Sequence, residues 1–264
     1  VSEIYKLKNK KILITGAFGL IGSVLTKRLI KNKNELILLD HKISSNKKKE
    51  ILKFKKDLPI FDIDLKNKKK LKNFFLSQSK ILKGLNTVVN LAANDRKIDK
   101  KNILFQKDFH NYEIKLIKDS LDNNLLGTVN ICQEVCKFFL KNKVKNANII
   151  NIASTYSVVA PNPSLYDNRK NKPVDYILSK GSIPILTKYI AINYSKRNIR
   201  CNCLVPHAII NNPSKEFLKK FKKLSPLGRT CSVDEAVEPL LFLISDGSSY
   251  NATSHITRSI RNQK

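Results

Sequence analysis

The stretch from Ile12 to Gly22 constrains the fold of this chain more than any other feature. It reads Ile-Leu-Ile-Thr-Gly-Ala-Phe-Gly-Leu-Ile-Gly, so a short apolar run passes directly into glycines spaced three apart. The apolar run is typical of a strand buried on both faces. Gly16 allows a turn at positive φ, Gly19 allows backbone to approach a phosphate, and Gly22 allows a new helix to pack closely. We expect a strand, a turn and then a helix over Ser23–Asn32.

A turn of this kind, with its amides at the start of a helix, can bind the pyrophosphate of a dinucleotide. The run Glu35–Asp40 supports this, because it predicts a second strand that ends in an acid where dinucleotide folds place a carboxylate. Asp40 would accept hydrogen bonds from the adenosine ribose and repel a 2′-phosphate, which favours NAD over NADP. The positive charge of Lys42, two residues later, would weaken this preference. The alternatives are a purely structural strand-turn-helix and an ordinary acid at the end of a strand.

Length and composition suit a single α/β domain over residues 1–264. With 42% apolar residues the chain can form a full core, and no segment reaches the apolar length of a membrane span. The first residues, Val1–Lys11, contain charges but no apolar signal-peptide core, so we expect a cytoplasmic protein. The five cysteines have no metal-ligand spacing with the four histidines, which predicts reduced, mostly buried thiols and no metal site.

The net charge of +29 would favour a nucleic-acid or acidic-membrane partner if it were concentrated. The lysines are instead spread along the chain among many Asn and Ile residues, and there is no RNA-binding motif. Runs such as Asn46–Lys56 and Lys66–Lys72 are interpreted as solvated loops or outward helix faces. We expect neither a specific nucleic-acid partner nor a membrane partner.

The rest of the chain alternates apolar strand patterns with helical patterns. Further strands are expected at Ile60–Leu65, Asn86–Ala93, Asn148–Ala153 and Ile199–Val205, and further helices at Leu71–Leu76 and Leu121–Phe139. This order predicts an α/β fold, a Rossmann-like doubly wound parallel β-sheet with helices on both faces.

Several short motifs occur in a characteristic order. They are Thr15–Gly22, Asp64-Leu65, Asn90-Leu91-Ala92-Ala93, Asn124-Leu125, Ser154, and the Tyr-x-x-x-Lys pair Tyr176 and Lys180. In order and spacing the chain resembles the short-chain dehydrogenase/reductase family, from about Lys8 to Ser249. The resemblance implies an NAD(P)-dependent oxidoreductase with four catalytic residues, Asn124, Ser154, Tyr176 and Lys180. It also implies cofactor contacts from Gly16, Phe18, Gly19, Leu20, Ile21, Gly22, Asp40, Asp64, Leu65, Asn90, Ala92, Tyr176, Lys180 and Pro206.

The chemistry explains why these side chains should converge. Hydride transfer at a carbinol needs a proton acceptor, and a phenol of ordinary pKa is a poor one near neutrality. An ammonium at Lys180, one helical turn away, would stabilise the phenolate of Tyr176, while Ser154 would donate to the substrate oxygen. By resemblance, Asn124 positions a water in the proton relay. The alternative is that these four are unrelated polar residues at the ends of strands and helices.

A second pair with the same spacing, Tyr166 and Lys170, competes with Tyr176 and Lys180. Its distance from Ser154 is common in the family. However, Asp167-Asn168-Arg169 between the two members is typical of a turn, and only a helix places positions four apart on one face. We therefore predict Tyr176 as the catalytic tyrosine and an inserted loop at about 157–175.

Three departures from the family pattern bear on activity. His207 replaces the glycine that usually follows Pro206, and Pro184 interrupts the helix that carries Lys180. After Tyr250 the Thr-Gly and Val-Asp-Gly-Gly elements are missing, so 250–264 forms an atypical tail, with an altered final strand and subunit contact expected. Two function classes stay open: an NAD-dependent oxidoreductase, and a catalytically impaired dinucleotide-binding protein with a binding or scaffold role.

The inserted loop resembles a subgroup associated with bacterial surface-sugar and flagellin modification. This implies a small-molecule substrate, a sugar or sugar derivative with a hydroxyl or keto group. The loop offers Asn162, Ser164, Asp167 and Asn168 to substrate hydroxyls, whereas a steroid or acyl site would be more apolar. The alternative is that the loop packs at a subunit interface. Family members commonly form tetramers or dimers through the helices around Asn124 and Tyr176, so we expect a homotetramer or homodimer.

Overall fold

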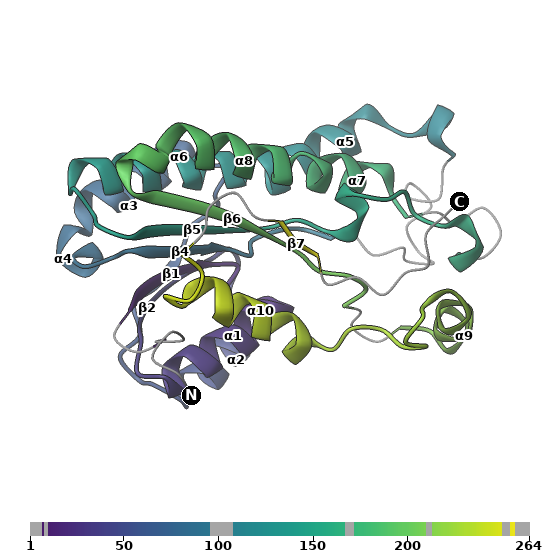
Figure 1. Cartoon of the computed structure of the whole chain (residues 1–264), viewed down its shortest axis with the longest axis horizontal. Helices are drawn as coiled ribbons and strands as arrows, with labels where there is room; N and C mark the ends of the chain where they lie inside the picture. The colour runs from purple at the N-terminus through teal and green to yellow at the C-terminus, as the bar shows by residue number, and fades with distance from the viewer. Residues whose placement is uncertain are drawn as a thin grey trace.

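The computed structural model describes residues 7, 10–95, 108–166, 172–209, 213–249 and 254–256. Its centre is a parallel sheet in the order β3-β2-β1-β4-β5-β6-β7 (Figure 1). The strands are β1 (Lys11–Thr15), β2 (Glu35–Asp40), β3 (Ile60–Asp62), β4 (Thr87–Asn90), β5 (Ala147–Ile152), β6 (Ile199–Val205) and β7 (Ser254–Ile256). The predicted doubly wound α/β fold is confirmed.

Helices cover both faces of this sheet (Figure 1). One face carries α3 (Lys68–Ser77), α4 (Ser79–Leu82), α5 (Ile114–Ser120), α6 (Gly127–Lys141), α7 (Val174–Gly181) and α8 (Ile183–Tyr194). The other face carries α1 (Leu20–Lys31), α2 (Ser45–Leu52) and α10 (Val233–Ile244). The helix α9 (Lys215–Leu224) precedes α10 in the chain but lies away from it, beyond the end of the sheet. Each face has its own apolar core, one around Leu71 and Phe139 and the other around Leu25 and Leu240.

The strand order reverses beside β1, which pairs with β2 on one side and β4 on the other. At such a switch point the loops after neighbouring strands diverge and leave a crevice at the carboxyl ends of the strands, where doubly wound folds bind their ligands. The glycine turn follows β1 at this point, and Asp40 ends β2 beside it. The fold therefore brings the predicted dinucleotide residues to one edge of the sheet.

Predicted elements differ from observed ones mainly at their ends. The strands β2 and β6 have the predicted bounds, whereas β3 stops at Asp62 rather than Leu65. The predicted helix Leu121–Phe139 is a π-helical segment, η4 (Leu121–Leu126), followed by α6. The expectation of an altered final strand is refined: β7 forms at Ser254–Ile256 and pairs in parallel with β6, although it has only three residues. The other residues of the 250–264 tail lie outside the described residues.

The lysine-rich runs lie on helices, as expected for solvated faces. The run at 46–56 includes most of α2, and the run at 66–72 leads into α3, whose lysines are exposed. Four cysteines are buried and Cys231 is half-buried, and all five are free thiols. None of the helices in the described part of the chain combines the length and the apolar content that a membrane crossing requires.

Candidate active site

The glycine turn after β1 leaves no room for a side chain at Gly16 or Gly22. Gly16 has a φ of +65°, and a Cβ there would lie 2.6 Å from the backbone nitrogen of Ala92. A Cβ on Gly22 would collide with the carbonyl oxygen of Gly16. The helix α1 begins at Leu20 without a side-chain cap on its first amides. Exposed amides at a helix start beside a close backbone turn match what a pyrophosphate needs, so these residues fit a dinucleotide.

The carboxylate of Asp40 is tied to this turn. Its Oδ2 accepts a hydrogen bond of 2.8 Å from the backbone N–H of Phe18, and its Oδ1 accepts one of 2.8 Å from the N–H of His41. Each carboxylate oxygen can accept a further bond. The ammonium of Lys47 also reaches the turn, where it donates to the carbonyl of Phe18 at 3.1 Å. Asp40 therefore stands at the edge of the turn with capacity for ribose hydroxyls.

The acids after β3 extend this edge. The ring of His41 bonds Asp62 at 3.0 Å, and this hydrogen bond lowers the pKa of the Asp62 carboxyl. Asp64 accepts from the backbone N–H of Lys66 at 3.0 Å, and Leu65 is buried. Three carboxylates, of Asp40, Asp62 and Asp64, thus lie at the carboxyl ends of β2 and β3, which makes this edge of the sheet locally acidic within a basic chain.

Two predicted cofactor residues follow β4 and contact the sheet. The amide of Asn90 is buried and donates to Asn151 on β5 at 2.9 Å. The backbone N–H of Ala92 donates to the hydroxyl of Thr15 at 3.3 Å. The Asn90 side chain thus joins β4 to β5, and the backbone of Ala92 holds the loop after β4 against the end of β1.

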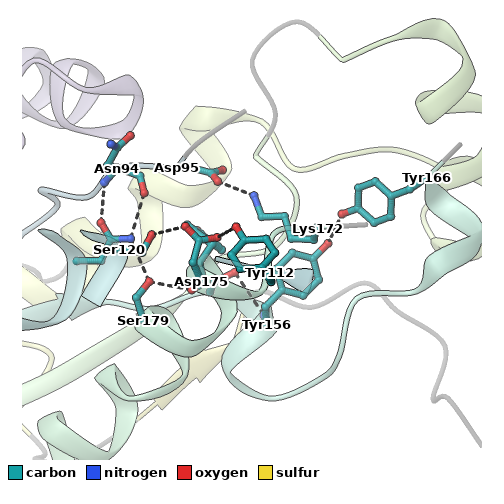
Figure 2. Close-up of polar contacts among 12 residues, drawn as sticks. Asn94, Asp95, Tyr112, Ser120, Tyr156, Tyr166, Lys172, Asp175 and Ser179 are labelled. Atoms are coloured by element: carbon teal, nitrogen blue, oxygen red, sulfur yellow. Dashed lines mark hydrogen bonds and ion pairs between the residues drawn. The ribbon is translucent and has the colours of Figure 1, made fainter. Parts of the chain in front are cut away.

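Asn124 lies fully buried in the π-helical segment η4. Its side chain accepts from the N–H of Asn94 at 2.7 Å and donates to the carbonyl of the same residue at 3.0 Å. It also donates to the Ser179 hydroxyl on α7 at 3.0 Å. Figure 2 shows Asn94 and Ser179 on either side of this contact. Asn124 therefore joins the loop after β4 to the helix that carries Tyr176, and π-helical turns often occur at functional sites.

The buried carboxylate of Asp175 fixes the start of α7. It accepts from the Tyr112 hydroxyl at 2.8 Å and from the Ser120 hydroxyl at 2.7 Å (Figure 2). Asp175 is fully buried, and it immediately precedes Tyr176. A carboxylate in this environment is stable only while its oxygens are hydrogen-bonded. The pair of bonds consequently sets the position of α7 relative to α5 and η4.

Replacing Asp175 with alanine should destabilise the fold. The change removes the acceptor of two buried hydroxyl bonds, for which we expect a loss of about 2 kcal/mol in the free energy of unfolding. Urea denaturation followed by circular dichroism measures this loss. Asp57→Ala, at an exposed loop position, is the matched control and should change the free energy by less than about 0.5 kcal/mol. Equal losses in the two variants would show that Asp175 has no anchoring role.

Ser154, Tyr176 and Lys180 come together above the end of β5. The Tyr176 and Ser154 side chains are hydrogen-bonded to each other. Burial raises the pKa of the Tyr176 phenol, Asp95 raises it further, and the bond with Ser154 opposes this. Lys180 is buried, its Nζ donates to the Ile152 carbonyl at 2.7 Å, and burial lowers its pKa to about 8. A hydroxyl, a phenol and an ammonium in this order can hold a substrate oxygen and move its proton.

The competing tyrosine occupies a different position. Tyr166 follows the short 3₁₀ segment η6 (Pro163–Leu165) and lies on no α-helix, while its predicted partner Lys170 is outside the described residues. Its hydroxyl lies 3.0 Å from the Tyr156 hydroxyl, as Figure 2 shows, and burial raises its pKa. Tyr176 and Lys180, in contrast, are one turn apart on α7.

The departures from the family pattern have local structural solutions. The His207 ring bonds the Thr155 hydroxyl at 2.8 Å and lies 5.5 Å from the Phe221 ring of α9. The carbonyl of Pro206 accepts from the N–H of Thr155 at 3.1 Å. Pro184 ends the helix as expected, because α7 stops at Gly181 and α8 restarts with the proline in its first turn. At that position a missing N–H costs little.

Of the predicted substrate-loop residues, Asn162 and Ser164 are described. The Asn162 side chain accepts from the Ser164 N–H at 2.9 Å and caps η6. Asp167 and Asn168 lie outside the described residues. Two residues beside Tyr176 were not predicted from the sequence. They are Lys172, which forms an ion pair with Asp95 at 2.6 Å, and the buried Asp175. The available signals were the position of Lys172 four residues before Tyr176 and the acid Asp175 directly before it.

Known proteins share sequence similarity with this chain over most of its length. The family model described as enoyl-(acyl carrier protein) reductase matches residues 16–257. The chain is 30% identical over 252 residues to post-translational flagellin modification protein A of Campylobacter coli, which covers 92% of this chain and 94% of that protein. It is 23% identical to glucose 1-dehydrogenase of Gluconobacter oxydans, over 93% of this chain and 88% of the other.

Solved structures share the fold. A short chain dehydrogenase from Leptospira borgpetersenii with bound NAD+ superposes with a TM-score of 0.82 at 24% identity, covering 97% of this chain and 94% of that one. A gluconate 5-dehydrogenase from Burkholderia cenocepacia in complex with NADP and tartrate gives a TM-score of 0.81 at 20% identity, with coverages of 97% and 96%.

Proposed function

Because the chain belongs to the short-chain dehydrogenase/reductase family and is therefore an oxidoreductase, we propose that it transfers hydride between NAD(H) and a hydroxyl or keto group of a sugar or sugar derivative, in bacterial surface-glycan or flagellin modification. The observation that carries the proposal is the approach of Ser154 and Tyr176 above β5, with Lys180 one turn along α7. These side chains occupy the same edge of the sheet as the glycine turn.

When bound, the nicotinamide cofactor supplies or accepts the hydride, and the residues of this chain handle the proton. Ser154 donates to the substrate oxygen and orients it toward Tyr176. The Tyr176 phenolate removes the hydroxyl proton during oxidation, and the phenol returns it during reduction. The Lys180 ammonium favours the phenolate and can hold the nicotinamide ribose. Asn124, through its bonds to Asn94 and Ser179, keeps α7 in register with the loop after β4.

Asp40 supports NAD as the preferred cofactor. Its carboxylate is fixed by two backbone N–H bonds at the edge of the glycine turn, where a 2′-phosphate would meet its negative charge. We expect NAD(H) to bind at least tenfold more tightly than NADP(H), a difference of about 1.4 kcal/mol. Fluorescence titration with NADH and NADPH measures this ratio, and Asp40→Asn should reduce it.

The lysines near the turn provide the control. The ammonium of Lys47 donates a hydrogen bond to the Phe18 carbonyl in this turn. Lys47→Gln should leave the NADH to NADPH ratio within about twofold of the wild type. The proposed preference would be contradicted if the wild type bound NADH and NADPH equally well. If Lys47→Gln then bound NADH more tightly than NADPH, the Lys47 charge would be what neutralises Asp40.

The substrate class is supported by polar groups around Tyr176. The Asp95 carboxylate and Tyr156 act on Tyr176, and the Tyr156 hydroxyl lies 3.0 Å from that of Tyr166, so this region offers donors and acceptors suited to several hydroxyls. The flagellin-modification and glucose dehydrogenase relatives agree with this chemistry. A screen of keto-sugars, sugar phosphates and nucleotide sugars against steroid and acyl ketones, with NADH oxidation as the readout, tests it. Turnover confined to the apolar ketones would end the sugar proposal.

A homo-oligomer, a homotetramer or homodimer, fits the outer face of α7 and α8. Four large apolar side chains are exposed there, Leu178, Ile185, Tyr189 and Ile192. Exposed apolar groups that gather on one face mark contact surfaces more often than isolated ones do. Light scattering after size-exclusion chromatography gives the oligomer size. We also propose that the protein is cytoplasmic.

A further inference from the structure

A second lysine beside Tyr176 lies outside the family motif. The Lys172 ammonium stands 4.2 Å from the centroid of the Tyr176 ring. The same nitrogen forms an ion pair of 2.6 Å with Asp95, which Figure 2 shows reaching over from the loop after β4. Only 15% of the Lys172 side chain is exposed, against 52% for Asp95. A lysine ordinarily extends its charge into water, so a buried stem with its charge against a ring needs a reason.

The physical effect of this placement depends on the charge of the ring. A cation over the face of a tyrosine is attracted by the π electrons, and the attraction grows when the phenol becomes a phenolate. Burial and Asp95 both act in the opposite direction, since both raise the pKa of the Tyr176 phenol. A cation held at the ring is therefore placed where it favours the proton-accepting form.

We propose that Lys172 is a positioning residue of the reaction, whose ammonium, held over the Tyr176 ring by Asp95, stabilises the phenolate and fixes the direction of the ring. The proposal rests on the proposed function, because it requires Tyr176 to be the proton acceptor. The charged or titratable groups around the phenol are Lys172 from the segment before α7, Asp95 from the loop after β4, Lys180 from α7 and Tyr156 from the turn after β5.

Lys180 alone is a weak source of positive charge in the unliganded site. Its ammonium is committed to the Ile152 carbonyl, and burial lowers its pKa to about 8. Near that pH about half of the molecules lose this charge. The Lys172 ammonium instead forms an ion pair of 2.6 Å with Asp95. Lys180 thus lies one turn along the same helix as Tyr176, whereas Lys172 lies across the face of the Tyr176 ring.

The test measures the pKa of Tyr176 directly in the full chain saturated with NAD+. Labelling all tyrosines with ¹³C at Cζ gives an NMR signal that shifts on ionisation, and the Tyr176 signal is the one absent from Tyr176→Phe. We expect Lys172→Gln to raise the Tyr176 pKa by about one pH unit. Lys172→Arg should restore it, and Asp95→Asn, which keeps an oxygen for Lys172, should lower it. Lys188→Gln, at an exposed position on α8, is the control and should leave it unchanged.

The possible results distinguish a failure of this inference from a failure of the proposed function. A Tyr176 pKa that is the same in Lys172→Gln and the wild type would overturn the inference, as would a Tyr176 signal that does not titrate below pH 10 in the wild-type complex. Neither result touches the proposed function, which fails separately if Tyr176→Phe keeps wild-type turnover in the substrate screen. A raised pKa in Lys172→Gln that Lys172→Arg restores supports the inference.

Discussion

Tyr176→Phe is expected to lower turnover by a few orders of magnitude while it leaves NADH affinity within about twofold of the wild type. The change deletes one hydroxyl, the one hydrogen-bonded with Ser154, and keeps the ring that Lys172 covers. Because the phenol acts on the substrate proton, its loss affects the chemical step more than cofactor binding. Steady-state kinetics with the best sugar substrate and an NADH titration measure the two quantities separately.

Tyr166→Phe is the matched control, since it removes a hydroxyl from the competing Tyr-x-x-x-Lys pair. That hydroxyl contacts Tyr156 rather than Ser154, and Tyr166 lies on no α-helix. We expect turnover to fall by less than about tenfold, through weaker substrate binding. A reversal, with Tyr166→Phe inactive and Tyr176→Phe active, would show that the catalytic tyrosine had been placed wrongly.

Lys180→Met should abolish turnover and yet make the unfolding free energy larger at pH 7. Burial of the ammonium lowers the Lys180 pKa from 10.5 to about 8, so holding this charge inside the fold opposes folding. Each pH unit of that difference corresponds to about 1.4 kcal/mol, and the lost bond to the Ile152 carbonyl offsets part of it. We expect a net gain of about 2 kcal/mol for an inactive enzyme.

The effect of pH on the free energy of unfolding follows from the protonation of Lys180 in the folded and unfolded chains. Below pH 8 Lys180 is protonated in both folded and unfolded chains, and the full penalty for burying the charge applies. Between pH 8 and 10.5 the unfolded chain binds more protons than the folded one, so the wild type gains stability as pH rises. The advantage of Lys180→Met should therefore shrink over this range. Urea denaturation at pH 7 and pH 10 measures it, with the exposed Lys188→Met as control. A Lys180→Met protein less stable than the wild type at both pH values would contradict the prediction.

The fold could be predicted from the sequence because its signals are local. Apolar runs that end at an acid or before a proline fixed β2 and β6 to the residue, and the glycine spacing located the turn after β1. The length of β3 was overestimated, since its last apolar positions, Ile63 and Leu65, pack into the core from a loop. An apolar residue buried outside a strand has the same sequence pattern as one inside it.

The parts of the site that sequence reasoning missed depend on contacts between distant segments. Asp175 bonds Tyr112 across 63 residues, and Lys172 bonds Asp95 across 77. No periodicity connects such positions, so a single sequence gives no sign of their pairing. His207 is the opposite case, because the sequence marked it as a departure from the family pattern after Pro206. In the structure its ring is instead bonded to Thr155 and packed near Phe221.

Transfer of deuterium from [4,4-²H₂]NADH to the carbinol carbon of a sugar product tests the central claim most directly, since it distinguishes an oxidoreductase from a protein that only binds the dinucleotide. With saturating NADH and the keto-sugar that turns over fastest in the screen, we predict deuterium on the reduced carbon with the wild type and none with Tyr176→Phe. Tight NADH binding by the wild type without deuterium transfer to any keto-sugar, sugar phosphate or nucleotide sugar would contradict the account.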